Sequence, residues 1–342
     1  MNLALHKKII DGLYKVSVLL MNLLIFAFAA SAQEVMNTNG EVHTIAAVLE
    51  NYQDFIVPQN NSLQELNLEV EGADGGWIEY NYYDRFRSTR TQRVNGGQGA
   101  TISATFEIGP GAGQIPPGAH LRFIVGNRAE REKIDVVPAE GIGAGGGGGT
   151  GVLLSKDRGT TWHIILVAGG GGGGAIKMEE DDIKSSQGLP GVTEQTNTSH
   201  TYTRQVKASG NTGDGGEFPL LTGGGGGAFT DGKFENGRLY YGNAGWKNRN
   251  FGEQPLGGLG GTHRESRDGG WGFGGGGSGN KGGGGGGGYS GGGAGLPGYG
   301  GSGGSSYVET MVARALNVSK QQNGDTDNPG DGHVRYQFVV AN

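Results

Sequence analysis

Cysteine is absent from the 342 residues of the sequence. This absence excludes disulfide bridges, thiolate metal sites and lipid attachment through cysteine. Charged residues are also scarce, at 18 %, and both signs are scattered along the chain instead of forming the basic stripe that nucleic-acid binding requires. We therefore predict no nucleic-acid partner, and a fold stabilised by burial and backbone hydrogen bonds.

Motifs of catalysis and metal binding are also lacking. The seven histidines are scattered, and the chain contains neither H-E-x-x-H nor the phosphate-binding G-x-x-x-x-G-K-[ST]. The acidic stretches 179–182 and 325–331 could attract calcium, but solvated turns are the simpler interpretation of both. We predict no catalytic residue, no metal, no cofactor and no enzymatic activity, with a hydrolase that carries no visible motif as the alternative.

Long apolar runs are missing after residue 32. Before it, a lysine-containing start precedes the apolar run 16–30, and the small residues 30–32 resemble a cleavage site. The run is short for a membrane span, although an uncleaved anchor is the alternative. We expect 1–32 to be a signal peptide and the rest of the chain to be secreted or held at the cell surface, without a membrane span.

Glycine is what the sequence has in abundance: it has 75 glycines, of which 59 lie between residues 141 and 304. Uninterrupted runs occur at 145–149, 169–174, 223–227, 274–277 and 282–288. Proline and serine do not rise with glycine, and the chain keeps four Trp, twelve Tyr and twelve Phe. This composition argues against a disordered linker, and a flexible polymer of the cell-wall or silk type is the alternative.

Alternation with a period of two predicts β-strands on both sides of the glycine-rich block. Leu66, Leu68 and Val70 alternate with polar residues, as in a half-buried strand. Further strands are expected at 55–58, 77–86, 100–108, 118–126, 132–138, 151–155, 162–168, 305–318 and 332–340, with a short helix as the alternative over 308–316. We expect the N-terminal strands, the hairpin 151–168 and the C-terminal strand to share one sheet system, with His163 facing outward.

Glycine runs can become ordered only through their backbones. In an extended helix with three residues per turn the N–H and C=O groups point outward, and without side chains several such helices can pack together and hydrogen-bond to each other. Each bond contributes only about 1 kcal/mol, so several segments must associate. We predict a packed bundle of polyglycine II helices, with structural positions at Gly145, Gly169, Gly174, Gly223, Gly274, Gly282 and Gly288.

Four ordered stretches carry a family resemblance. They are "FIVP…LQELNLEVEGADGG" from residue 55, "GGGGGTGVLL…WHIILVAGGGGGGA" from 145, "GFGGGGSGNKGGGGGGGYSGGGAG…GGSSYV" from 272 and "GDGHVRYQFVV" from 330. The series resembles the extracellular glycine-rich domain of the anaplastic lymphoma kinase and leukocyte tyrosine kinase receptors, in a secreted, stand-alone form of bacterial type. The resemblance covers about 50–342 and implies a mostly β fold, with a β-sandwich-like sheet core and polyglycine helices packed beside it.

On this basis the chain divides into three parts. The signal peptide is followed by a polar leader, 33–48, and by a glycine-rich domain, 49–342. Within that domain we expect a β core at 50–168 and 305–340, and polyglycine segments across 141–304 with insertions at 178–222 and 229–268. Receptor signalling is not implied, and the ligand site of the receptors has no counterpart motif here.

Aromatic and basic residues interleave within the second insertion. The candidate ligand-binding residues are Phe234, Arg238, Tyr240, Tyr241, Trp246 and Arg249. Aromatic and arginine side chains are common anchors of recognition surfaces, although the aromatics could instead cover the glycine bundle. Trp271, Phe273, Tyr289 and Tyr299 interrupt the densest glycine stretch, and we expect them to act as spacers at the edge of the bundle.

These patterns lead to two hypotheses about function. The first is an exported, non-enzymatic binding or adhesion protein whose polyglycine-stiffened β scaffold presents the insertions to an extracellular protein or glycan. The second is a structural component of an extracellular matrix, envelope or filament, in which the bundle supplies stiffness and the chain associates with copies of itself.

Overall fold

The computed structural model describes residues 34–83, 88–180, 182–195, 209–210, 212–218, 222–233, 241–243, 245, 247–249, 252–263, 267–323 and 330–341. Within these ranges the chain is all-β and forms several sheets. This confirms the predicted mostly β class. The predicted signal peptide, 1–32, lies outside the described residues.

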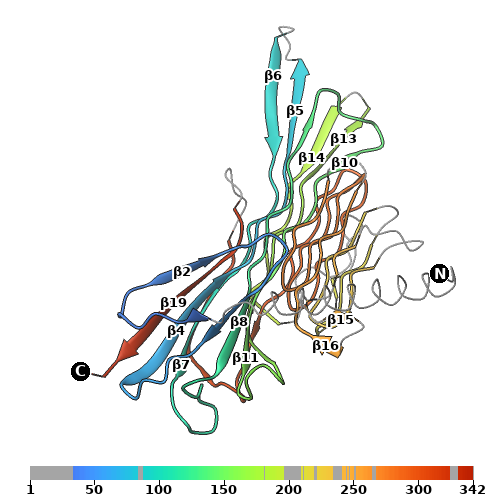
Figure 1. Ribbon diagram of the computed structural model, residues 1–342. Coiled ribbons are helices and arrows are strands. Elements are labelled where there is room, and N and C mark those ends of the chain that lie inside the picture. Colours follow the sequence, from blue (N-terminus) through green and yellow to red (C-terminus); the bar gives the residue numbers. More distant parts are fainter. Residues whose placement is uncertain are drawn as a thin grey trace, which may run out of the picture.

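Two large sheets form the base of the molecule (Figure 1). Among the described residues, a six-stranded sheet has the order β1 (Glu34–Val35), β3 (Gln53–Ile56), β8 (His120–Ile124), β11 (Thr150–Ser155), β12 (His163–Ala168) and β17 (Tyr307–Val308). A five-stranded sheet has the order β18 (Ala315–Gln321), β7 (Thr101–Glu107), β4 (Leu63–Glu71), β19 (His333–Val340) and β2 (His43–Ala46).

The two large sheets share one apolar core. Leu66 of β4 and Phe106 of β7 lie in the same buried cluster as Leu121 of β8 and Ile165 of β12. The strands alternate as their sequences predict, because the polar residues between these positions face away from the core. The expected single sheet system is therefore two packed sheets, with the hairpin β11–β12 in one and the C-terminal β19 in the other. His163 is exposed, as predicted.

The residues expected to form a polar leader contribute to both sheets. β1 pairs with β3 through Val35 and Ile56, and β2 pairs with β19 through Ile45 and Val334. Met36, between the two strands, is buried in the shared core. The sequence predicts no strand here because apolar residues are too few to show a period.

The stretch 305–318 contains no helix: β17 is followed by bends at 310–313 and then by β18. Glu309 determines this path, since its Oε1 accepts the N–H groups of Thr310, Met311 and Val312 at 2.8, 2.5 and 3.2 Å. Burial alone would raise the pKa of Glu309, but these bonds, with one from the Tyr307 hydroxyl, hold the pKa below its ordinary value.

Two small sheets lie at the opposite end of the molecule, at the top of Figure 1. One has the order β6 (Thr89–Val94), β5 (Ile78–Tyr83), β9 (Glu132–Ile134), and the other β10 (Ile142–Gly143), β13 (Ala175–Glu179), β14 (Asp182–Ser186). A shared apolar cluster that includes Ile78, Val94 and Ile176 packs them together. A separate hairpin joins β15 (Lys247–Arg249) to β16 (Gly252–Gln254).

Four glycine-rich segments connect the large sheets with the small ones. Residues 72–77 lead from β4 to β5, 95–100 from β6 to β7, 144–149 from β10 to β11, and 169–174 from β12 to β13. In Figure 1 these segments continue the strands side by side across the middle of the molecule. The strands at both ends therefore set the direction and position of each glycine segment.

The outer face of the six-stranded sheet is apolar as well. Trp271, Phe273 and Tyr289 are buried there in a cluster with Leu153 and Val167. We expected these aromatics to be spacers at the bundle edge; they instead join the later glycine segments to the sheet. Tyr299 lies elsewhere, with its ring 5.7 Å from Lys177 Nζ.

A buried ion pair completes that face. Both Nε and Nη2 of Arg122 donate to the Asp54 carboxylate at 2.7 Å, and the two side chains are 7 % and 8 % exposed. The guanidinium lies 3.8 Å from the Tyr52 ring centre and 4.3 Å from that of Trp162. Bidentate geometry and aromatic stacking offset the desolvation of the two charges. This pair could not be predicted from the sequence, because it depends on the register between β3 and β8.

Candidate functional site

The run 282–288 lies at the centre of the glycine-rich region and bonds to its neighbours with a period of three. The N–H groups of Gly284 and Gly287 donate to the carbonyls of Ala144 and Gly147 at 2.9 Å. The N–H groups of residues 285 and 288 donate to the carbonyls of residues 223 and 226. The N–H groups of residues 283 and 286 donate to the carbonyls of residues 299 and 302. Three neighbouring segments thus receive the N–H groups of this run in turn.

The carbonyl groups of the same run follow the same rule. The carbonyls of Gly284 and Gly287 accept from the N–H groups of Gly173 and Gly170. The carbonyls of residues 283 and 286 accept from the N–H groups of residues 295 and 292, and the carbonyl of Gly285 accepts from that of Gly277. Six described segments therefore surround the run. The segment 169–174 has an equivalent set of neighbours on the other side, including 72–76, 97–100 and 187–191. We refer to these mutually bonded segments as the glycine bundle.

A side chain has no room at the glycine positions inside the glycine bundle. A Cβ added to Gly285 would overlap the carbonyl oxygen of Gly292, and a Cβ added to Gly282 would overlap the carbonyl oxygen of Gly295. All seven predicted structural glycines are buried, and among them only Gly274 has a positive φ, +80°. Glycine is therefore needed here mainly for the missing Cβ and not for an unusual backbone angle.

Asp74 fixes the entry of β4 into the bundle. It is 5 % exposed, and its carboxylate accepts the N–H groups of Gly99 and Gly330 at 2.9 and 2.7 Å. Burial raises the pKa of Asp74, and the two backbone hydrogen bonds oppose that rise. This residue connects three segments that are distant in the sequence.

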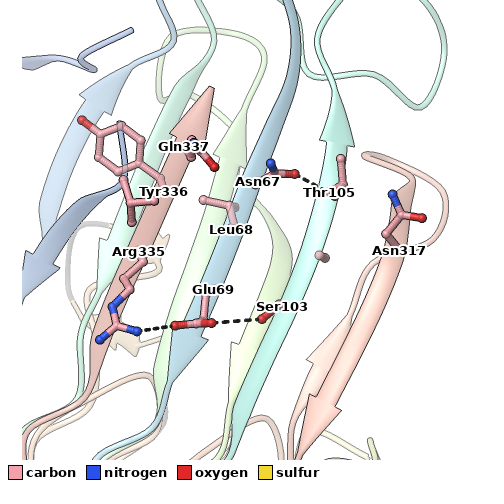
Figure 2. Close-up of a pocket in the computed structure, with 11 residues that line it drawn as sticks. Asn67, Leu68, Glu69, Ser103, Thr105, Asn317, Arg335, Tyr336 and Gln337 are labelled. Carbon is pink, nitrogen blue, oxygen red and sulfur yellow. Dashed lines mark hydrogen bonds and ion pairs between the residues drawn. The ribbon is translucent and has the colours of Figure 1, made fainter. Parts of the chain in front are cut away.

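A first depression lies on the outer face of the five-stranded sheet and has a volume of about 380 Å³ (Figure 2). Its polar side chains pair with each other across neighbouring strands. Glu69 accepts from Arg335 at 2.8 Å and from Ser103 at 3.5 Å, and Thr105 donates to Asn67 at 2.8 Å. Cross-strand pairs of this kind stabilise a solvent-facing sheet. We call this depression the sheet-face pocket.

A second and larger depression, the tip cleft, opens between the two small sheets and has a volume of about 800 Å³. Its lining combines aromatic, apolar and polar side chains. These are Tyr80, Asn81, Tyr82, Thr89, Gln92, Asp135, Val136, Val137, Met178, Asp182, Ile183 and Ser185. Concave sites that combine apolar walls with a few fixed polar groups are typical of ligand binding.

One wall of the tip cleft is a hydrogen-bonded row on β5 and β6. Tyr80 and Gln92 face each other in the register of these strands, and the Tyr80 hydroxyl donates to Gln92 Oε1 at 2.5 Å. Gln92 Nε2 then donates to the Tyr82 hydroxyl at 3.5 Å. Burial, and secondarily Tyr82, raises the pKa of Tyr80, so its hydroxyl stays protonated at neutral pH.

The rest of the tip cleft is partly apolar and partly acidic. Met178 and Ile183 are direct partners on β13 and β14 and are half-buried. Asp135 accepts from Asn81 Nδ2 at 3.1 Å. Asp182 pairs with Lys184 at 2.6 Å, and this hydrogen bond holds the pKa of Asp182 below its ordinary value.

The predicted binding residues of the second insertion stay a prediction. Phe234, Arg238, Tyr240 and Trp246 lie outside the described residues. Tyr241 is half-buried, and Arg249 ends β15, where its backbone pairs with Gly252.

The tip cleft was not among the sites predicted from the sequence. One signal was available, because 77–86 is rich in aromatics and alternates Ile78, Tyr80 and Tyr82 with polar residues. The other wall comes from the start of the insertion 178–222, which was expected to face a partner. The two walls of the tip cleft are distant in the sequence, and the fold brings them together.

No protein-family model and no curated protein matches this chain. The resemblance to the receptor glycine-rich domain therefore stays a prediction. Among the described residues, no helix has the length and apolar character needed to cross a bilayer. In the same part of the chain, no group of three or more His, Asp or Glu side chains is placed to hold a metal ion.

Proposed function

We propose that the protein is an exported, non-enzymatic binding or adhesion protein in which the glycine bundle holds the tip cleft rigidly above the sheet core. One observation carries this proposal. Four strands of the cleft sheets, β5, β6, β10 and β13, continue directly into bundle segments that end in the large sheets. The partner would be an extracellular protein or glycan bound in the tip cleft.

The proposal includes a conformation for the bundle segments, namely polyglycine II helices. In its support, the hydrogen-bond neighbours of 282–288 and 169–174 recur every third residue, as three residues per turn require. A six-residue segment such as 169–174 would then span about 19 Å, at roughly 3.1 Å per residue. That length would separate the tip cleft from the sheet core.

Binding is tested with the fluorescently labelled full chain on cell surfaces and extracellular matrices. We expect saturable binding, which Tyr82→Ala in the tip cleft reduces and Arg335→Ala in the sheet-face pocket leaves unchanged. Binding by Tyr82→Ala equal to that of the unaltered chain would remove the cleft from the proposal. Absence of saturable binding on every surface would overturn the proposed function itself.

Stiffness and association are tested separately. Amide hydrogen exchange across 282–288 should be as slow as in the core strand β4, since both are hydrogen-bonded and buried. Exchange at the rate of an unstructured peptide would contradict the scaffold. Size-exclusion chromatography with light scattering distinguishes a monomeric binding protein from the matrix or filament component considered above.

A further inference from the structure

We propose that the tip cleft binds a neutral oligosaccharide; this names the ligand class of the binding site proposed above and rests on that proposal. The cleft volume of about 800 Å³ falls within the range of about 300–1,000 Å³ in which small-molecule ligands are bound. Such a cleft can enclose a few linked sugar rings and leave the ends of a longer glycan in solvent.

The polar chemistry of the cleft matches hydroxyl groups. Six lining side chains carry hydroxyl or amide groups: Tyr80, Asn81, Tyr82, Thr89, Gln92 and Ser185. Groups of this kind both donate and accept hydrogen bonds, as sugar hydroxyls do.

Two of these polar groups are held in place before a ligand arrives. Gln92 accepts from Tyr80 and donates toward Tyr82, so its amide is held between the two hydroxyl groups. The Tyr82 hydroxyl accepts in this arrangement and can still donate its own proton. Fixed donors reduce the entropy lost on binding.

The apolar groups of the cleft match the C–H faces of a sugar ring. Met178 and Ile183 form one wall opposite the tyrosine row, and Val136, which is 80 % exposed, lies at the cleft as well. The rings of Tyr80 and Tyr82 lie 6.2 Å apart and inclined by 45°. Flat aromatic and aliphatic surfaces beside fixed polar groups suit a ligand that is apolar on its faces and polar at its edges.

The charges of the cleft argue against an anionic ligand. All its lining residues are described, and the charged ones are the two carboxylates Asp135 and Asp182. A sulfate, phosphate or sialic acid would meet these without a lining cation. A cationic peptide is the competing ligand, but Lys184 already neutralises Asp182, and an ammonium group only donates.

The test uses the full chain and isothermal titration with defined probes. The probes are neutral tetrasaccharides of glucose, galactose, mannose and N-acetylglucosamine, the sulfated form of each, and tetralysine. We expect at least one neutral probe to bind and Tyr82→Ala to weaken it about tenfold or more. Arg335→Ala is the matched control outside the cleft and should bind like the unaltered chain.

Each other outcome overturns the ligand class. Tighter binding of a sulfated probe or of tetralysine would show that charge governs recognition, and failure of every probe would exclude these neutral glycans. Circular dichroism establishes that Tyr82→Ala is folded, and Tyr82→Phe, which removes only the hydroxyl, is measured beside it. If no glycan binds while cell-surface binding still requires Tyr82, the ligand class fails and the proposed function stands.

Discussion

The sheet core and the glycine bundle are both buried and ordered, but they are stabilised in opposite ways. In the core, side chains such as Phe106 and Leu66 exclude water, and the backbone bonds only within each sheet. In the bundle there are almost no side chains, and each segment bonds to several neighbours at once. The core should therefore suffer most when side chains are removed, and the bundle when they are added.

The largest effect is expected from Gly285→Ala at the centre of the bundle. Its Cβ would overlap the Gly292 carbonyl, and that oxygen cannot move without shifting a segment that is itself bonded on several sides. We expect a loss above about 5 kcal/mol, the size of the most damaging single substitutions. Urea unfolding measures it, with Gly330→Ala as the control, since nothing lies within 4 Å of a Cβ there. Equal stability of the two variants would contradict the packing of the bundle.

In the sheet core, the substitution to compare with Gly285→Ala is Phe106→Ala, which removes a side chain instead of adding one. Phe106 is fully buried between the large sheets, and its removal leaves a cavity that should cost about 3–5 kcal/mol. The control is Met311→Ala, at a side chain 81 % exposed, which should change stability by less than about 0.5 kcal/mol. A loss below about 1 kcal/mol for Phe106→Ala would mean that the bundle, and not the core, supports the fold.

A smaller effect is expected when a side chain is removed from the bundle. The Ser302 hydroxyl donates to the Gly293 carbonyl at 3.0 Å, and its backbone N–H donates to the same carbonyl at 2.9 Å. Ser302→Gly keeps the backbone bond, so we expect a loss of only about 1–2 kcal/mol. Hydrogen exchange across 282–288 should stay slow. A loss as large as that of Gly285→Ala would show that the bundle depends on side chains after all.

The smallest effect concerns pH and the turn between β11 and β12. Hydrogen bonds from Thr161, and then from Ser155, lower the pKa of Asp157 to about 2. Because this folded-state pKa lies below the ordinary one, the turn is stabilised above the ordinary pKa and loses that contribution as the pH falls toward 2. At pH 5 the melting temperature of Asp157→Asn should be lower than that of the unaltered chain. The difference between the two melting temperatures should disappear near pH 2. A difference that is independent of pH would contradict the assignment.

Much of the sheet core could be predicted from the sequence. The alternation of Leu66, Leu68 and Val70 predicts both the strand and its buried face, and Ile164–Ala168 shows the continuous apolar character of a strand covered on both sides. β1 and β2 could not be found, because short edge strands carry too few apolar residues. Arg122 and Asp54 look like surface residues in the sequence, and only the register of β3 and β8 buries them together.

The tip cleft could not be predicted for a related reason. Its tyrosines lie on one small sheet and its methionine and isoleucine on another, about 100 residues later in the chain. Neither half is a motif alone. The aromatic residues of the second insertion are close in sequence and form a visible pattern, whereas the residues of the tip cleft are close only in space.

The sequence by itself determined where side chains are present and where they are missing, and therefore which segments can exclude water and which can let another backbone approach. Only the tertiary structure decided which glycine segment lies beside which. One run of glycines has the same chemistry as another, so nothing within a run selects its neighbours. The strands at its ends make that choice, because their side chains fix the register and direction in which each run enters the bundle.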